Sequence, residues 1–291
     1  MRDIDEFNIT QAVIARNAAA GDARVRELMT SLVQHVHAFA REAKLTEAEW
    51  SEGMRFLAEC GRRSDDRRDE FARLSDALGL SMLVTAQSHR VPRGCTEAAC
   101  IGPFQADGAP HCEHGDDIAG RAQGEPCYVR AQVRALDGRP IAGAEVRVWQ
   151  CGADGVYNGA QAHSEGGHMC GAFTTGADGG LHFRSIVAAP HPVARDGPVV
   201  RMLHALGRHA WRPAHLHFIV TAPGHEPLVT QVLRAGDPYL DSDAAFGVRA
   251  SLVADWIHHG PGLAPDGQQS AVPFTTVDFV FVLNNSQGDK P

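Results

Sequence analysis

The chain has 291 residues and a net charge of −8 at pH 7, with 44% hydrophobic and 21% charged residues. This balance allows a sizeable core in one large domain or two ordinary ones, and the acidic charge argues against a nucleic-acid-binding protein. The mean hydropathy is −0.21, and no apolar run reaches the ~18 residues of a membrane span. The first ten residues are too polar and acidic for a targeting signal. We therefore expect a cytoplasmic protein with no nucleic-acid or membrane partner.

The first ninety residues have the periodicity of helices. Apolar residues recur at helical spacing over 25–40 and 69–84, and an alanine-rich run covers 10–19. Thr46 and Glu49 fit a capping box that opens another helix. No catalytic motif lies in this part of the chain, so we expect a helical packing or oligomerisation domain.

After Pro92 the pattern changes to short alternating runs punctuated by Gly, Pro and Asp. Spacing of this kind is typical of a β-sandwich or barrel. The expected elements are strands over 128–136, 144–149, 216–220 and 277–283, with a loop over 262–270. The predicted class is therefore α+β, with a helical domain at residues 1–100 and a mainly antiparallel β-sandwich at residues 101–291.

The cysteine and histidine residues limit the kinds of functional site that the chain can form. Seven cysteines without a CxxC pair predict buried reduced thiols, and the nucleophile-elbow, P-loop, GxGxxG and HExxH motifs are absent from the sequence. His215 and His217 lie two apart in an alternating run, so both can reach one metal ion from the same strand face. Leu216 and Phe218 would then face the core. The alternative is a solvated pair of histidines on a strand surface.

Eight segments along the chain carry a more specific signal. They are LTEAEW (45–50), LSDALGLSMLV (74–84), IGPF (101–104), GRPIAGAEVRVWQ (138–150), DGVY (154–157), DGP (196–198), GRHAWRPAHLHFIVTAPG (207–224) and DPYLDSDAAFGV (237–248). In this order they resemble the intradiol ring-cleavage dioxygenases, in particular the hydroxyquinol and chlorocatechol branch. The resemblance implies a helical dimerisation domain, a β-sandwich catalytic domain, and a non-haem iron that serves to cleave catechols between their two hydroxyls. It also implies a homodimer that can hold lipid in an apolar channel at its interface.

The resemblance also implies a set of site residues. In the family the iron is typically Fe(III), held by two tyrosinates and two histidines, which correspond here to Tyr157 as the first tyrosine and to His215 and His217. Arg212 and Gln231 match the arginine and glutamine beside the substrate and oxygen. Phenolate oxygens stabilise Fe(III), which acts as a Lewis acid on a catecholate. A cationic arginine can stabilise negative charge on the ring carbon that meets oxygen.

The chain departs from the family at the second tyrosine. The family reads roughly Tyr-Pro-Ile-Pro-x-Asp-Gly-Pro, whereas residues 191–198 read HPVARDGP, so His191 occupies the position of the displaceable tyrosine. His191 is either a fourth metal ligand or a nearby base with water in the ligand's place. With one phenolate fewer, Fe(II) becomes easier to populate. An imidazole, with a pKa of about 6.5, is also a weaker base than a tyrosinate, at about 10.

Two further positions near the family's substrate entrance differ. Gln105 stands where the family often has a tyrosine or histidine, and Cys170-Gly171 replaces an arginine-glycine pair. We expect the substrates to be O2 and a catechol or hydroxyquinol-like ring. Two alternatives stay open: an iron-dependent oxygenase acting on an amino- or otherwise substituted phenol, and a paralogue that binds aromatic compounds or lipid without turnover.

Overall fold

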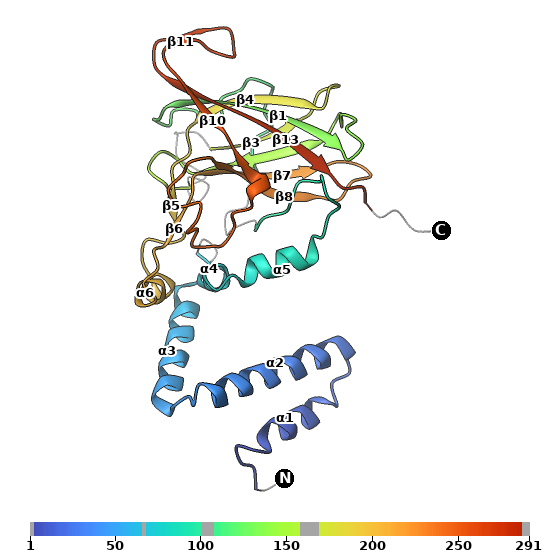
Figure 1. The fold of residues 1–291 in the computed structure, drawn as a ribbon, viewed down its shortest axis with the longest axis vertical. Coiled ribbons are helices and arrows are strands. Elements are labelled where there is room, and N and C mark those ends of the chain that lie inside the picture. Colours follow the sequence, from blue (N-terminus) through green and yellow to red (C-terminus); the bar gives the residue numbers. More distant parts are fainter. Residues whose placement is uncertain (1–2, 66–67, 101–107, 158–168, 287–291) are drawn as a thin grey trace, which may run out of the picture. The chain divides into compact units, whose positions relative to one another are not determined.

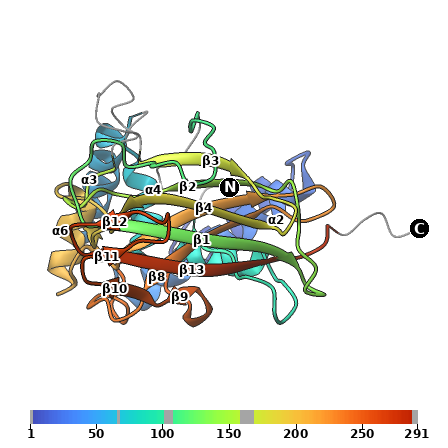
Figure 2. The ribbon, with the colours of Figure 1, turned by 90° about the horizontal axis from the view of Figure 1, so that it is seen from above.

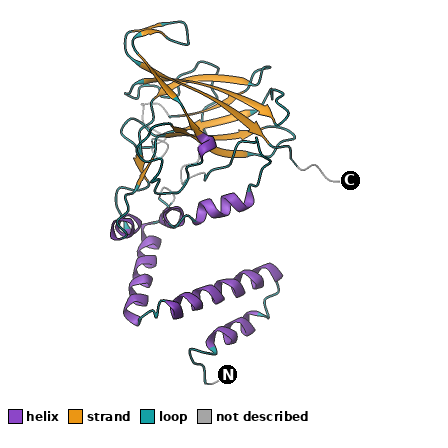
Figure 3. Ribbon diagram, in the orientation of Figure 1, coloured by secondary structure: helices purple, strands orange, loops and turns teal. Residues whose placement is uncertain are grey.

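The computed structural model describes residues 3–65, 68–100, 108–157 and 169–286. The predicted α+β class is confirmed, with helices in the first part of the chain and strands in the second (Figure 3). The chain divides into two compact units, Met1–Glu59 and Cys60–Pro291. No helix in the described ranges is long and apolar enough to cross a bilayer. Gln105 and the segment 101–104 lie outside the described residues.

Three helices begin the chain: α1 (Ile9–Asn17), α2 (Ala23–Glu42) and α3 (Glu47–Arg63). Arg41 on α2 donates to the carbonyl of Glu6 at 2.6 Å and to the hydroxyl of Thr10 at 2.8 Å, which ties α1 to α2. The capping box is confirmed. The Glu49 carboxylate accepts the Thr46 N–H at 2.9 Å, and the Glu49 N–H donates to the Thr46 hydroxyl at 3.3 Å. These bonds satisfy N–H groups that the first turn of α3 leaves without helical partners.

The apolar run over 69–84 is not one helix but two, α4 (Glu70–Ala77) and α5 (Leu80–Ser88). Gly79 between them has a φ of 72°, a left-handed conformation that ends a right-handed helix and that glycine adopts without steric cost. The apolar residues keep their helical spacing on both sides of this break. The periodicity of the sequence therefore did not reveal the break between the two helices.

Two sheets form the sandwich of the second unit (Figures 1 and 2). The first has the order β10-β13-β1-β4, made of β1 (Pro126–Ala135), β4 (Gly180–Ile186), β10 (Trp256–His259) and β13 (Phe274–Leu283). The second has the order β3-β2-β7-β8-β9, made of β2 (Glu145–Trp149), β3 (Cys170–Thr174), β7 (His215–Thr221), β8 (Leu228–Arg234) and β9 (Val253–Ala254). Most pairs are antiparallel, as predicted. The pairs β1–β13 and β8–β9 are parallel.

Short elements complete this unit. β5 (His191–Pro192) pairs with β6 (Trp211–Arg212), and α6 (Pro198–Ala205) lies between them in the chain. A 3-10 helix (Ala250–Leu252) precedes β9. The segment predicted as a loop over 262–270 is instead a small hairpin of β11 (Gly262–Leu263) and β12 (Gln269–Ser270). Its strands were missed because two residues are too few to show an alternating pattern.

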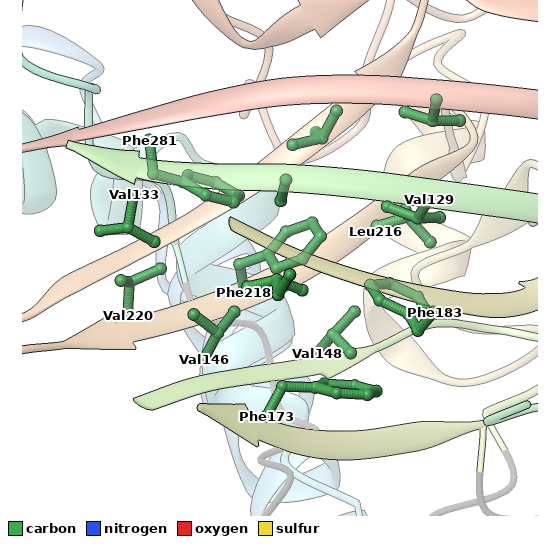
Figure 4. Close-up of a cluster of buried hydrophobic side chains, with 14 of the residues drawn as sticks. Val129, Val133, Val146, Val148, Phe173, Phe183, Leu216, Phe218, Val220 and Phe281 are labelled. Carbon is green, nitrogen blue, oxygen red and sulfur yellow. The ribbon is translucent and has the colours of Figure 1, made fainter. Parts of the chain in front are cut away.

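The core lies between the two sheets (Figure 4). Large apolar side chains of both sheets meet there, among them Val129, Val133, Phe183 and Phe281 from the first sheet and Val146, Val148, Phe173, Leu216, Phe218 and Val220 from the second. The rings of Phe218 and Phe281 have centroids 4.8 Å apart. All seven cysteines are free thiols, four of them buried.

Neighbouring residues of β13 provide a test of this packing. Phe281 is fully buried, whereas Val280 is 44% exposed on the opposite face. Phe281→Ala should lower the free energy of unfolding by about 3–5 kcal/mol, and the control Val280→Ala by no more than about 0.5 kcal/mol. Denaturant titration of both variants measures the difference. Equal losses would contradict the register of β13.

Candidate metal and substrate site

Tyr157 and three histidines from separate segments come together beside β7. The ring centroid of Tyr157 lies 5.0 Å from that of His191 and 6.2 Å from that of His217. His191 and His215 are 5.1 Å apart, and His215 and His217 are 4.5 Å apart. All four candidates from the sequence therefore lie in one cluster.

β7 presents its two histidines on one face because side chains two apart on a strand share a face. Leu216 and Phe218 lie on the other face, within the core. The histidine face is also out of water, since His215 is 0% and His217 3% exposed. Trp149 of the adjacent β2 covers His217, with parallel rings at 4.9 Å. A solvated surface pair is thus excluded.

The nitrogen atoms of the β7 pair converge. The Nε2 atoms of His215 and His217 are 2.9 Å apart, close to the ~3.0 Å expected for two imidazoles that bind one metal at right angles with bonds of about 2.1 Å. The Nδ1 of His215 donates to the Pro213 carbonyl at 2.7 Å, which leaves its Nε2 with a lone pair. Burial lowers the pKa of both rings well below the usual value, reinforced by the charge of Arg212. Both rings are therefore neutral, the state that a metal ligand requires.

His191 lies across the β5–β6 ladder from Arg212. Its Nδ1 is 3.6 Å from the sulfur of Cys151, a thiol that donates to the Ala189 carbonyl at 3.1 Å. Burial, followed by the charge of Arg212, lowers the pKa of His191 to about 3. His191 is therefore a neutral imidazole at physiological pH.

Tyr157 contributes an oxygen to the cluster. Its ring is half-buried, but its hydroxyl oxygen is buried. Burial raises the pKa of the Tyr157 phenol well above its usual value, and the charge of Arg212 offsets part of that rise. Without a cation the phenol keeps its proton, whereas a bound metal favours the phenolate. Arg195 donates to the Asp154 carbonyl at 3.0 Å, which ties the segment before Tyr157 to the segment after His191.

Arg212 and Gln231 form a buried polar network next to the histidines. Arg212 Nε donates to Asp243 Oδ1 at 3.1 Å, and its Nη2 donates to Asp243 Oδ2 at 3.3 Å and to Gln231 Oε1 at 3.1 Å. Gln231 lies on β8 directly opposite His217. Burial alone would lower the pKa of Arg212, but the Asp243 carboxylate outweighs it and raises that pKa. The guanidinium stays charged.

Asp243 is the residue that sequence reasoning missed. It lies inside the DPYLDSDAAFGV segment, but nothing in its spacing showed that its carboxylate would meet Arg212, 31 residues away. Burial by itself would raise the pKa of Asp243. The Arg212 charge and hydrogen bonds outweigh this and lower it. The available signal was chemical, because a buried arginine needs an acidic partner.

Cys170 also approaches the site. It pairs with Trp149 across β3 and β2, and Trp149 pairs in turn with His217. Within the described ranges, no group of three His, Cys, Asp or Glu side chains is arranged to hold a metal ion. The three histidines by themselves do not form such a group, and Tyr157, a residue of another type, is the remaining candidate ligand.

Comparison with known proteins identifies the family of this chain. Residues 22–96 match the model of the catechol dioxygenase N terminus, and residues 102–284 match the dioxygenase model. The chain is 51% identical to the 6-chlorohydroxyquinol 1,2-dioxygenase of Cupriavidus pinatubonensis over 98% of this chain and 99% of that protein. This chain belongs to the intradiol ring-cleavage dioxygenase family.

Other relatives agree with this result. This intradiol dioxygenase is 42% identical to the hydroxyquinol 1,2-dioxygenase of Nocardioides simplex over 96% of this chain and 95% of that protein. Its fold matches the crystal structure of the Pseudomonas putida hydroxyquinol 1,2-dioxygenase with a TM-score of 0.89 and 38% identity, over 97% of this chain and 99% of that one. The resemblance drawn from the sequence is confirmed. Such enzymes are generally iron-dependent, and a phenol beside neutral imidazoles is a donor set that suits iron.

The low pKa of His191 predicts how the stability of the metal-free protein depends on pH. The folded protein resists protonating His191 until about pH 3, whereas the unfolded chain takes up that proton near pH 6.5. The metal-free protein should therefore lose stability relative to a His191→Asn variant as the pH falls, by about 1.4 kcal/mol per pH unit below about pH 6.5. Denaturant titrations of both proteins between about pH 7 and pH 4.5 measure this. Parallel stability curves would contradict a buried neutral His191.

Proposed function

We propose that this enzyme cleaves the ring of hydroxyquinol, or of a chlorinated hydroxyquinol, between its two adjacent hydroxyl-bearing carbons. Both atoms of O2 enter the product, a muconate-type dicarboxylic acid. The observation that carries the proposal is the convergence of His215 and His217, with Nε2 atoms 2.9 Å apart, beside the buried Tyr157 oxygen. The names of the two relatives from Cupriavidus pinatubonensis and Nocardioides simplex support this choice of substrate.

The proposed iron site consists of Tyr157, His191, His215 and His217. When bound, the iron supplies Lewis acidity and redox access for a chelated aromatic diol and O2. The protein holds the histidines neutral by burial and orients His215 through the Pro213 carbonyl. Because only one phenolate is present, we propose an iron whose Fe(II) state is more accessible than with two tyrosinates, although Fe(III) is the family's typical resting state.

His191 has two possible roles within this proposal. As a ligand, it would use Nε2, since its Nδ1 faces the Cys151 sulfur. As a base with water in the ligand's place, it would accept a proton from the second hydroxyl of the diol. Its low pKa favours the first role, because a ring that resists protonation is a poor base.

Arg212 and Gln231 are the proposed catalytic residues. Arg212 is charged and buried, so its field acts in a low-dielectric environment on negative charge that develops at the ring carbon meeting O2. Gln231 accepts from Arg212 and donates to the Gly247 carbonyl at 2.8 Å. These two hydrogen bonds hold the Gln231 amide in place on β8, and Gln231 lies opposite His217 of β7.

An amino- or otherwise substituted phenol is the second candidate substrate. Two observations favour it: an imidazole at His191 weakens the proton-accepting path that simple catechols need, and Cys170 removes the positive charge of the family's arginine near the entrance. Turnover would fall most for a diol whose second hydroxyl is less acidic, because that proton is the hardest for an imidazole to accept. Oxygen uptake with catechol, hydroxyquinol and 2-aminophenol distinguishes these candidates.

We also propose a cytoplasmic homodimer formed through the N-terminal helices. α2 leaves a row of large apolar side chains about half exposed: Val25, Leu28, Met29, Leu32, Val36 and Phe39. A second copy would remove this surface from water, at a gain of roughly 25 cal/mol per Å². An apolar channel between such faces would accept lipid acyl chains.

Iron content and oxygen uptake test the proposed function together. The wild type should bind about one iron per chain and consume O2 with hydroxyquinol, while His215→Ala and His217→Ala should lose both, because each removes an imidazole ligand. His225→Ala, at a half-buried histidine outside the cluster, is the matched control. Full iron retention in either β7 variant, or zinc in place of iron, would contradict the proposed site.

His191→Tyr tests the fourth ligand. The variant should restore a second phenolate, so that the visible tyrosinate-to-iron absorption deepens and cleavage of simple catechols increases. His191→Phe, which removes the donor while keeping a ring, should not deepen the colour. Visible spectra and catechol oxidation of the three proteins are compared side by side. A wild type that already shows two-tyrosinate absorption would rule out His191 as a ligand.

A further inference from the structure

The guanidinium of Arg212 is held in one orientation by residues 243–247. Asp243 accepts from Nε at 3.1 Å and from Nη2 at 3.3 Å, a two-point contact that fixes the plane of the group. Gln231 accepts from Nη2 at 3.1 Å. No described residue accepts a hydrogen bond from the remaining nitrogen, Nη1.

The backbone of Gly247 packs closely against Arg212, Gln231 and Asp243. A Cβ at this position would lie 2.6 Å from Arg212 Nη2, 3.0 Å from Gln231 Nε2 and 3.1 Å from Asp243 Oδ2. Its N–H donates to Asp243 Oδ2 at 2.8 Å, and its carbonyl accepts from Gln231. The Ala245 N–H donates to the other carboxylate oxygen at 3.1 Å. Asp243 is itself immobilised, and a side chain at position 247 would have to displace the Arg212 guanidinium.

We propose that Asp243 is a positioning residue for ring cleavage, acting through Arg212. This inference rests on the proposed function. By engaging Nε and Nη2, Asp243 leaves the Nη1 edge for the substrate and spares Arg212 any reorientation when negative charge develops on the ring. Asp243 also offsets a positive charge that would otherwise lie unpaired next to three neutral histidines.

A purely structural role for Asp243 makes a different prediction. If the ion pair only stabilised the fold, removing Asp243 would change stability without a specific loss of turnover. The effects of changing Asp243 and Arg212 on turnover would then multiply. If Asp243 acts through Arg212, removing it after Arg212 is gone should have almost no further effect.

The experiment is a double-mutant cycle of Asp243→Asn and Arg212→Ala in the iron-loaded enzyme with hydroxyquinol. Asp243→Asn should lower kcat about 10- to 100-fold, with iron content and KM nearly unchanged. In the Arg212→Ala background the same change should alter kcat less than about 3-fold. Asp278→Asn is the matched control, because Asp278 pairs with Arg130 on an exposed surface. Multiplicative losses would overturn the proposal.

Gly247→Ala provides a second variant that keeps every polar group. Its methyl should displace the guanidinium and lower kcat about 10-fold or more while iron content is retained. Gly260→Ala, which has open space around its Cβ position, should leave kcat unchanged. Unchanged turnover in Gly247→Ala would mean that the orientation of Arg212 is not limiting.

Denaturant midpoints of the metal-free proteins separate this inference from the proposed function. The midpoint shifts of Asp243→Asn and Arg212→Ala should be non-additive, because either change breaks the same buried pair. A wild type that takes up no O2 with hydroxyquinol would refute the proposed function. Additive midpoint shifts would refute the coupling of Asp243 to Arg212, whatever the substrate.

Discussion

The polar face of β7 lies out of contact with water, and the residues around it are arranged to meet that constraint. A buried polar atom without a partner destabilises the fold, and a buried charge does so more strongly. His215 donates from Nδ1 to the Pro213 carbonyl, and both rings are neutral. Arg212 carries a buried positive charge, which Asp243 pairs at 3.1 Å. The desolvation that makes the imidazoles available to a metal is also what requires an acidic partner for the arginine.

The segment that carries His191 is held by a series of ion pairs that runs from a buried glutamate to an exposed aspartate. Glu70, at the start of α4, is fully buried and accepts from Arg68 at 2.8 Å and from Arg73 at 2.7 Å. Arg68 also bonds to Asp196 at 2.8 Å, five residues after His191. Paired buried charges of this kind fix geometry more than they add stability. They anchor the His191 segment to α4, while Arg195 bonds to the segment that precedes Tyr157.

The proposed replacement of a tyrosine ligand by His191 would change the electrostatics of the site as a whole. A phenolate brings negative charge, whereas a neutral imidazole brings none. Among the described residues, the cluster thus has one phenol oxygen, that of Tyr157, and one fixed positive charge, Arg212, which is largely compensated by Asp243. Charge balance around a bound metal then depends more on the substrate's own oxygens than in a site with two tyrosinates. A substrate that chelates as a dianion would supply the missing charge.

The sequence by itself determined the class of fold, the strand that carries the histidine pair and the family. Side-chain alternation along residues 215–221 and the helical spacing of the first ninety residues are local properties, so the periodicity revealed them. The errors of the prediction from periodicity were also local. The apolar residues keep their helical spacing on both sides of the break at Gly79, and the strands of the hairpin at 262–270 are too short to show alternation. The pairing of Arg212 with Asp243, the neutrality of three histidines and the contact of Cys151 with His191 were decided only by the tertiary structure. Each depends on which distant segments meet and on how completely they exclude water, and neither quantity is contained in the spacing of residues along the chain.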